Sequence, residues 1–224
     1  MKSYRDWPIS KMNLKIIKDN ALKYLGYQGS IIDDSLNNLI DECLTEVIKY
    51  SDFKVVSQRY PLNHHPLSFN NLMIDYDDLK QLLKNCNEVM ISGYTLGLQL
   101  ERQLRYLAKI DMTRLTIMDA LSSSYLEYLS DKYDDEIIEE KRTFRFCPGY
   151  GNVDISLNKT LANILDTNKH IGLSVTDSDL LLPQKSMIGI IGIGDNNRIK
   201  SCANCLNIQH CKFRKAGVRC YNND

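Results

Sequence analysis

The residues around Pro148 and Gly149 restrict the backbone of this chain in a specific way. A strand-like run, 143–146, leads into the pair, and an aromatic residue follows it. Proline holds φ near the value of the second position of a tight turn, and glycine supplies the positive φ that a type II turn requires. The sequence therefore predicts a strand that ends in a tight turn, with free backbone N–H and C=O groups around it.

Two side chains flank this turn and are aimed at one spot. Arg145 offers a fixed fork of donors that suits a carboxylate. Tyr150 offers a flat, electron-rich face that suits a stacked ring or a cation. A small zwitterion with a carboxylate and an aromatic or cationic part would fit both. The alternative is a structural arginine, paired with an acid of a neighbouring strand, beside an ordinary turn.

Composition argues against nucleic-acid and membrane partners. The chain has 224 residues with 28 basic and 28 acidic side chains, so it lacks the positive field typical of nucleic-acid binding. The N-terminal segment Met1–Pro8 contains no apolar core of a signal peptide. The longest apolar run, Met187–Ile193, is interrupted by glycines and too short to span a bilayer. We therefore expect a soluble, cytoplasmic protein.

Apolar periodicity predicts helices, some of them long, that alternate irregularly with strands, a pattern typical of an α+β fold. The acidic segment from Asp134 to Glu140 is expected to be solvated. Thr95 or a neighbour is expected to cap the helix that follows it. The expected helices lie near 14–25, 31–49, 76–85, 95–110, 113–132 and 157–166, and the expected strands near 52–60, 88–92, 143–146, 171–175 and 186–193.

Several segments, taken in order, resemble one protein family. They are Tyr24–Tyr27, Tyr94–Gly97, Asp119–Ser123, Arg145–Tyr150, Ile171–Ser178 and Leu182–Gly189. Together they resemble the activation (reactivation) domain of vitamin B12-dependent methionine synthase, in particular its free-standing, single-domain members. The resemblance predicts an activation-like domain over 1–200, with a helical part over about 1–50, and leaves 201–224 as a separate Cys-rich tail.

The resemblance implies a fold and a role. The fold is a curved, single α+β domain with a twisted, mainly antiparallel sheet flanked by helices. The role is to present S-adenosylmethionine to a cobalamin-carrying subunit of methionine synthase whose cobalt has oxidised to cob(II)alamin. An electron donor such as flavodoxin or ferredoxin reduces the cobalt, and the sulfonium methyl group is captured as methylcobalamin.

The resemblance also implies ligand-binding residues, and none with a catalytic role of its own. Arg145 would bind the ligand carboxylate, and Tyr150 would stack on its adenine or sulfonium. Backbone groups near Cys147 and Gly149 would hold the rest. Glu139 would bind the ligand ammonium group. Two other acids that could take its place are Glu140 and Glu127.

Two positions depart from the family pattern. Ser123 and Ile199 stand where the resemblance implies a ligand-contacting Glu and Tyr. These departures favour an alternative role, a metal-binding docking adaptor that has no methyl-donor site of its own. A further alternative keeps the chemistry and changes the client to another corrinoid methyltransferase protein.

The corrinoid itself is expected on a partner. The chain contains no Asp-x-His-x-x-Gly element of the kind that supplies the lower ligand of cobalamin. His64 and His65 stand in a loop next to a proline and are expected to be structural rather than metal-binding. The simplest inference is a protein that acts in trans.

The cysteines fall into two groups. Cys43, Cys86 and Cys147 stand among apolar neighbours, where free cysteine behaves as a small hydrophobe. The other four, Cys202, Cys205, Cys211 and Cys220, form a C-x2-C-x5-C-x8-C pattern in the tail. They could hold zinc as a folding staple, hold an iron–sulfur cluster, or be free thiols. Because the implied chemistry needs a low-potential electron, we favour the cluster.

Overall fold

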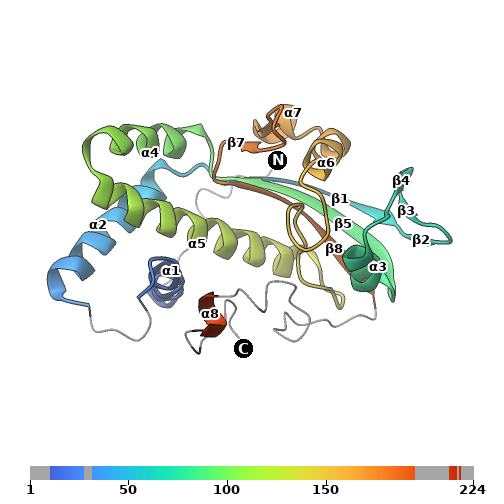
Figure 1. Cartoon of the computed structure of the whole chain (residues 1–224), viewed down its shortest axis with the longest axis horizontal. Coiled ribbons are helices and arrows are strands. Elements are labelled where there is room, and N and C mark those ends of the chain that lie inside the picture. The colour runs from blue at the N-terminus through green and yellow to red at the C-terminus, as the bar shows by residue number, and fades with distance from the viewer. Residues whose placement is uncertain (1–10, 28–31, 195–211, 216, 218–224) are drawn as a thin grey trace. The chain divides into compact units, whose positions relative to one another are not determined.

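The structure is a computed structural model that describes residues 11–27, 32–194, 212–215 and 217 (Figure 1). Its fold is α+β, as predicted. The helices are α1 (Lys11–Tyr24), α2 (Asp34–Tyr50), α3 (Asp77–Leu83), α4 (Leu98–Ile110), α5 (Met112–Ile137), α6 (Leu157–Leu165), α7 (Thr167–Ile171) and α8 (Lys212–Lys215). The strands are β1 (Lys54–Pro61), β2 (Asn63–His64), β3 (Leu67–Phe69), β4 (Leu72–Met73), β5 (Cys86–Thr95), β6 (Ser174–Val175), β7 (Leu181–Leu182) and β8 (Ser186–Gly194).

The main sheet has the strand order β1-β5-β8. Asp52 precedes β1 and donates its N–H to the carbonyl of Leu96, just beyond the end of β5 (2.8 Å). Leu62 follows β1 and donates to Asn87, near the start of β5 (2.9 Å). The start of one strand therefore pairs with the end of the other, which is the antiparallel arrangement that the family resemblance implies.

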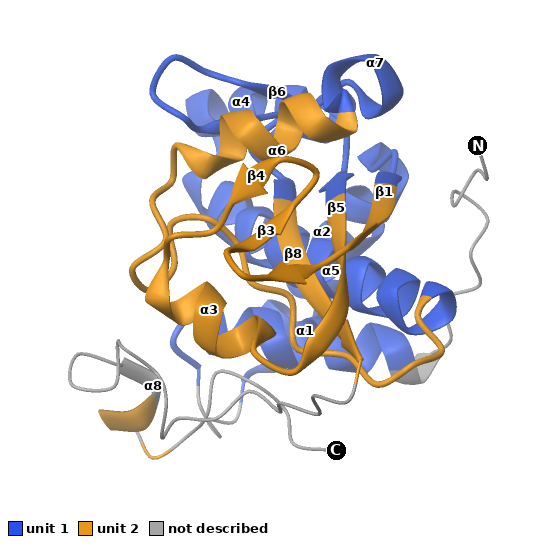
Figure 2. Ribbon diagram, turned by 90° about the vertical axis from the view of Figure 1, so that its right-hand side faces the viewer, with its two compact units in different colours: residues 1–56, 93–137, 166–187 blue, residues 57–92, 138–165, 188–224 orange. Residues whose placement is uncertain are grey.

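The chain divides into two compact units, coloured separately in Figure 2, and each is described by itself. Unit 1 comprises Met1–Val56, Gly93–Ile137 and Asp166–Met187. Its long helix α5 packs against α1, α2 and α4 (Figure 1). The core there is apolar, and its fully buried members include Ile17, Val47 and Leu121. Because these helices bury their apolar faces, the apolar periodicity of the sequence predicted them correctly.

Helix α5 extends further than the sequence predicts. It continues to Ile137, and Asp134 on its last turn is fully buried rather than solvated. The hydroxyl of Tyr94 donates a short hydrogen bond to the Asp134 carboxylate. Leu126, Ser130 and Asp134 recur every four residues and are all buried, so the acid continues the buried face of the helix. The prediction of a solvated segment was wrong at this residue.

Two other local details differ from the first expectation. Thr95 itself lies in β5 and does not cap α4; its neighbour Gly97, which has φ +83°, is the N-cap residue and donates its N–H to the Thr95 hydroxyl. The run 143–146 forms no regular strand but joins β8 through isolated antiparallel bridges, Arg142 to Ile193 and Phe146 to Ile190. Segments so short are held by their partners rather than by their own β-propensity.

Unit 2 comprises Ser57–Ser92, Ile138–Leu165 and Ile188–Asp224. It contains a small antiparallel sheet, β2-β3-β4, which the sequence did not predict; Asn63 pairs with Ser68, and Ser68 with Met73. Helix α3 is anchored by buried leucines on one face. No helix in the described ranges is long and apolar enough to cross a membrane.

The Tyr94–Asp134 bond makes a testable contribution to stability. We expect Tyr94→Phe to lower the free energy of unfolding by roughly 1–3 kcal/mol, because a buried carboxylate loses a donor. Chemical denaturation followed by circular dichroism measures this loss. Tyr125→Phe is the matched control, since Tyr125 is also buried in unit 1 and no hydrogen bond joins its hydroxyl to another described residue. Equal losses in the two variants would contradict the role of the bond.

Candidate functional site

The predicted turn at Pro148 is present. Tyr150 donates its N–H to the carbonyl of Cys147 (3.3 Å), and Gly149 has φ +88°, as a type II turn requires. The N–H of Gly149 donates to the carbonyl of Val153 (2.9 Å) and is therefore engaged within the loop. The expectation that the backbone groups here are free does not hold for this N–H.

The side chain of Arg145 packs directly against the backbone of Gly189. Phe146 and Ile190 exchange two backbone hydrogen bonds of 2.9 Å, which fixes the segment against β8. A Cβ atom on Gly189 would lie 2.5 Å from Cγ of Arg145 and 3.3 Å from Sγ of Cys147. Real side chains do not approach that closely, so the aliphatic part of Arg145 occupies the space that a larger residue at 189 would need. This contact gives a physical reason for the glycine in the segment Leu182–Gly189.

Tyr150 is displayed at the surface. Its exposed fraction is 69%, and the neighbouring Ile155 is 38% exposed. Cys147 and Arg145 are half-buried, while Gly149 is exposed. An aromatic ring held on a closed turn presents a face for stacking with little further loss of conformational freedom.

The three candidate acids differ in their partners. Glu140 makes a bidentate contact with Arg59 (2.7 and 3.1 Å), which lowers the pKa of Glu140 and raises that of Arg59. Glu127 accepts a hydrogen bond from Tyr24 (2.7 Å). Glu139 is exposed, its backbone hydrogen-bonds the Glu140 carboxylate, and its own carboxylate lies within electrostatic range of Arg59, whose pKa it helps to raise. Its ammonium-binding role stays a prediction.

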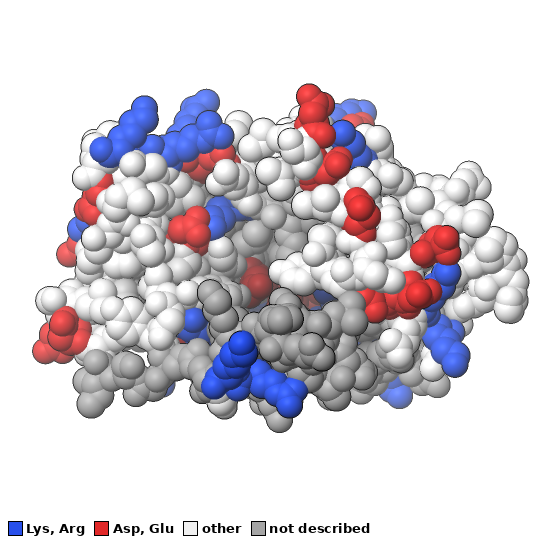
Figure 3. Space-filling model, in the orientation of Figure 1, with Lys and Arg blue, Asp and Glu red and all other residues white. Residues whose placement is uncertain are grey.

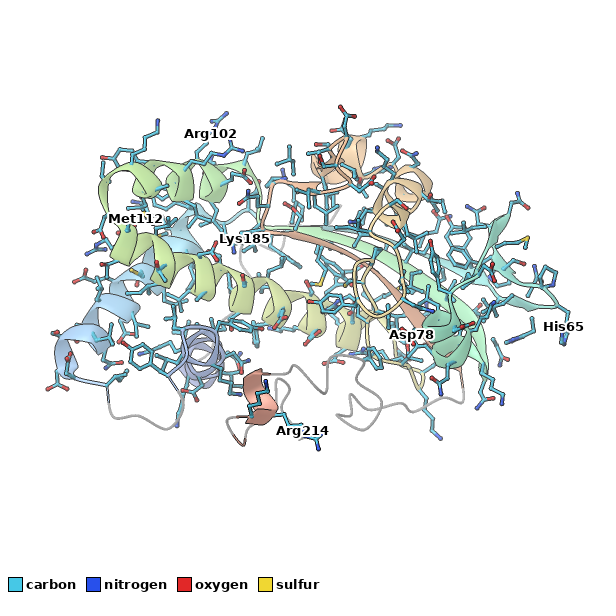
Figure 4. The ribbon with its side chains drawn as sticks, in the orientation of Figure 1. His65, Asp78, Arg102, Met112, Lys185 and Arg214 are labelled. Carbon is cyan, nitrogen blue, oxygen red and sulfur yellow. The ribbon has the colours of Figure 1, made fainter. Side chains whose placement is uncertain are left out.

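Ser123, one of the two departures, contacts a lysine. The ammonium of Lys185 donates to the Ser123 hydroxyl (2.9 Å) and pairs with Asp119 (2.7 Å). The Lys185 side chain is only 12% exposed, and Figure 4 shows it at the start of β8. An ion pair of Lys185 with Asp119 therefore lies beside the position where the resemblance implies an acid. Ile199, the second departure, lies outside the described residues.

The sequence did not predict one anchor of the turn. Asn152 donates its N–H to the carboxylate of Asp78 in α3 (2.9 Å), and the two residues are far apart in the sequence. Asp78 lies at the start of α3 in Figure 4. The sequence did not indicate this contact, because an acid in the first turn of a helix ordinarily interacts with the N-terminal end of that helix.

The cysteines outside the tail behave as small hydrophobes where they are buried. Cys43 and Cys86 are fully buried, and burial raises the pKa of the Cys43 thiol to about 11. His64 contacts the carbonyl of Cys86 through Nε2 (2.8 Å), which agrees with a structural role. Within the described residues, no group of three or more His, Cys, Asp or Glu is placed to hold a metal. Cys202, Cys205, Cys211 and Cys220 lie outside these residues.

Charge is mixed over the face shown in Figure 3. Basic and acidic side chains are both scattered over its described part, in agreement with the balanced composition. In that part, the basic side chains do not form a continuous stripe across the face of the kind that follows a phosphate backbone.

Comparisons with known proteins give a structural match only. No protein-family model matches the chain, and no curated protein matches it. Among solved structures it is similar to the crystal structure of the MetH reactivation domain bound to AdoHcy, with a TM-score of 0.63 and 12% sequence identity. The match covers 93% of this chain and 84% of that chain. At this identity the likeness establishes the fold.

The contact between Gly189 and Arg145 can be tested directly. We expect Gly189→Ala to displace the arginine and to cost about 1–3 kcal/mol of stability through overpacking. The Nε–Hε resonance of Arg145 in an NMR spectrum reports the displacement.

Gly192→Ala is the matched control for this change. Its new Cβ would meet Cys86 and Leu83, at 2.5 and 2.7 Å, instead of the arginine. It should therefore lower the unfolding midpoint while the Arg145 resonance stays in place. A Gly189→Ala protein with an unmoved Arg145 resonance would show that the close approach is unimportant.

Proposed function

We propose that this chain binds S-adenosylmethionine and serves as an accessory activation subunit for cobalamin-dependent methionine synthase. The observation that carries the proposal is the closed turn, with Arg145 packed on Gly189 and Tyr150 exposed, on a fold similar to that of the MetH reactivation domain bound to AdoHcy. Neither feature alone would support the proposal. An exposed Tyr beside a type II turn is common, and a shared fold does not define a function.

Each residue of the turn has a task in this proposal. The guanidinium of Arg145 binds the ligand carboxylate, because its fork of donors matches two oxygens. Tyr150 stacks on the adenine or faces the sulfonium. Glu139 binds the ammonium group, and backbone groups near Cys147 and Gly149 complete the contacts. The half-buried setting of Arg145 strengthens its interaction with an anion relative to a fully solvated pair.

The chain supplies the methyl donor, and a partner supplies the corrinoid. An electron from a donor such as flavodoxin or ferredoxin reduces the cob(II)alamin of the partner, and the methyl group then leaves the sulfonium for cobalt, which releases S-adenosylhomocysteine. The residues described here bind and orient the donor for this transfer. The site of action would be the cytoplasm.

A second candidate function follows from Ser123. Its hydroxyl accepts a hydrogen bond from Lys185, whose charge is balanced by Asp119, so a neutral hydroxyl stands where the resemblance implies a carboxylate. A cationic sulfonium ligand would gain no attraction from Ser123. This observation favours an adaptor that docks on a corrinoid protein, of methionine synthase or another methyltransferase, without a methyl-donor site of its own.

The division of the chain is part of the proposal. Residues 1–200 would form the activation-like domain, and 201–224 a tail that binds an iron–sulfur cluster or zinc through Cys202, Cys205, Cys211 and Cys220. A cluster would provide an electron relay toward cobalt, whereas zinc would only stabilise the tail.

Calorimetric titration tests the ligand site. Arg145→Ala is expected to weaken the binding of S-adenosylmethionine by roughly 10- to 100-fold, because an unpaired charged group costs about 1.5–3 kcal/mol. Arg102→Ala is the control, since Arg102 is an exposed arginine of α4 that points away from the helix in Figure 4. Equal affinity of Arg145→Ala and wild type would remove Arg145 from the site.

The same titration separates the two candidate functions. Wild-type protein that binds no S-adenosylmethionine, alone or with the cobalamin protein, would exclude the first. Reduction kinetics of the partner's cobalamin, with and without S-adenosylmethionine, then decide whether the chain still acts as an adaptor.

The tail makes a separate prediction. Anaerobically purified protein is expected to be brown, with broad visible absorption and bound iron, and Cys205→Ser should lose both. Cys43→Ala serves as the control, because Cys43 is buried in the core of unit 1 and should leave the absorption unchanged. A colourless, zinc-loaded sample would exclude the electron relay, and a metal-free sample would leave only free thiols.

A further inference from the structure

The tip of the turn is exposed and contains two glycines. Residues 149–152 are all exposed, and the chain becomes buried again only at Val153. Gly149 and Gly151 both adopt positive φ, at +88° and +59°. Glycine loses more conformational freedom on ordering than other residues, so a tip with two glycines and no buried side chain is costly to fix. Tyr150 stands between these glycines.

Contacts with α3 reach this tip from outside the loop. The carboxylate of Asp78 accepts the N–H of Asn152 (2.9 Å), two residues after Tyr150. In the amide orientation that satisfies both of its ends, the Asn152 side chain donates to the Asp78 carboxylate (3.2 Å) and accepts the N–H of Asp77 (3.1 Å). The Asp78 carboxylate therefore binds both the backbone and the side chain of Asn152. A hydrogen bond to a carboxylate is stronger than one between neutral groups.

Asp78 is itself held by a rigid element. It lies in the first turn of α3, whose Leu79, Leu82 and Leu83 are at most 2% exposed. The residue before the helix, Tyr76, makes no side-chain capping bond. Asn152 supplies an acceptor to that end of α3, and the buried face of the helix in turn fixes the carboxylate that holds the tip.

We infer that Asp78 is a positioning residue that holds the Tyr150 loop in its ligand-binding conformation; the inference rests on the proposed function. Backbone hydrogen bonds of Tyr150 with Cys147 and Val153 close the loop on itself, and the Asp78–Asn152 bond ties the closed loop to α3. Without the Asp78–Asn152 bond, the closed loop can shift relative to α3, and the orientation of Tyr150 shifts with it. The ligand must then order the loop as it binds, which lowers affinity without removing any contact to the ligand.

The test compares variants of the full chain in titrations with S-adenosylhomocysteine and S-adenosylmethionine. Asp78→Ala is expected to weaken binding by about 3- to 10-fold, the ordering cost of one or two residues. Asp78→Asn keeps an acceptor oxygen and should recover most of the affinity. Asp77→Ala is the matched control, since the Asp77 side chain is 90% exposed and its only ion pair is with Lys80 within the described residues (3.9 Å).

Two further variants separate positioning from helix capping and from general destabilisation. In a Tyr150→Ala background, Asp78→Ala should cause no further loss of affinity, because the ring that it positions is gone. Asn152→Ala removes the side-chain amide, which is an acceptor for α3 and a donor to Asp78, but keeps the backbone N–H that Asp78 binds, so its loss of affinity should be smaller than that of Asp78→Ala. An unchanged affinity in Asp78→Ala, an equal loss in the Tyr150→Ala background, or an equal loss in Asn152→Ala would overturn the inference.

A readout without ligand separates this inference from the proposed function. Amide hydrogen exchange of residues 149–153 should be faster in Asp78→Ala than in wild type, while exchange in β5 stays unchanged. Unchanged exchange at 149–153 would overturn the anchor even if the wild type binds ligand. A wild type that binds neither ligand would instead overturn the proposed function, and the exchange data would still decide whether Asp78 holds the loop.

Discussion

The fold depends on β5, an interior strand with hydrogen-bonded neighbours on both sides. Every residue from Val89 to Thr95 is buried, so its backbone groups must be satisfied by β1 and β8 rather than by water. This requirement fixes where β8 lies, and β8 in turn bridges to Phe146 through Ile190. The candidate ligand-binding turn is thus held, through two successive sets of backbone hydrogen bonds, by the strand that is least exposed to solvent.

Sequence periodicity predicted the fold well where elements are long. The apolar faces of the helices that pack on α5 repeat over several turns, and Gly26, with φ +86°, ends the first of them as expected. The strands β2, β3 and β4 have two or three residues each, too few for any alternation to be visible. The end of α5 was missed for another reason: Asp134 looks like a solvated acid until its partner Tyr94, from a distant segment, is known.

In the candidate site, too, the sequence predicted local geometry but not contacts between distant segments. The turn at Pro148 was predicted because two adjacent residues determine its geometry. The space above Gly189, the contact of Asp78 with Asn152, and the lysine beside Ser123 each join segments far apart in the chain. No short window of sequence contains both partners of such a contact. The residues expected to touch a ligand could therefore be named, while those that hold them in place could not.

The buried bond between Tyr94 and Asp134 has a consequence for motion. Helix ends ordinarily fray, because their last carbonyls and side chains are solvated. Here the last turn of α5 carries the acceptor of the buried Tyr94 hydroxyl, so opening of the turn without β5 would break this bond and leave the hydroxyl in an apolar core. Opening of this turn is therefore coupled to opening of the strand, so the two elements belong to one cooperative unit. The C-terminal turn of α5 is therefore expected to resist fraying.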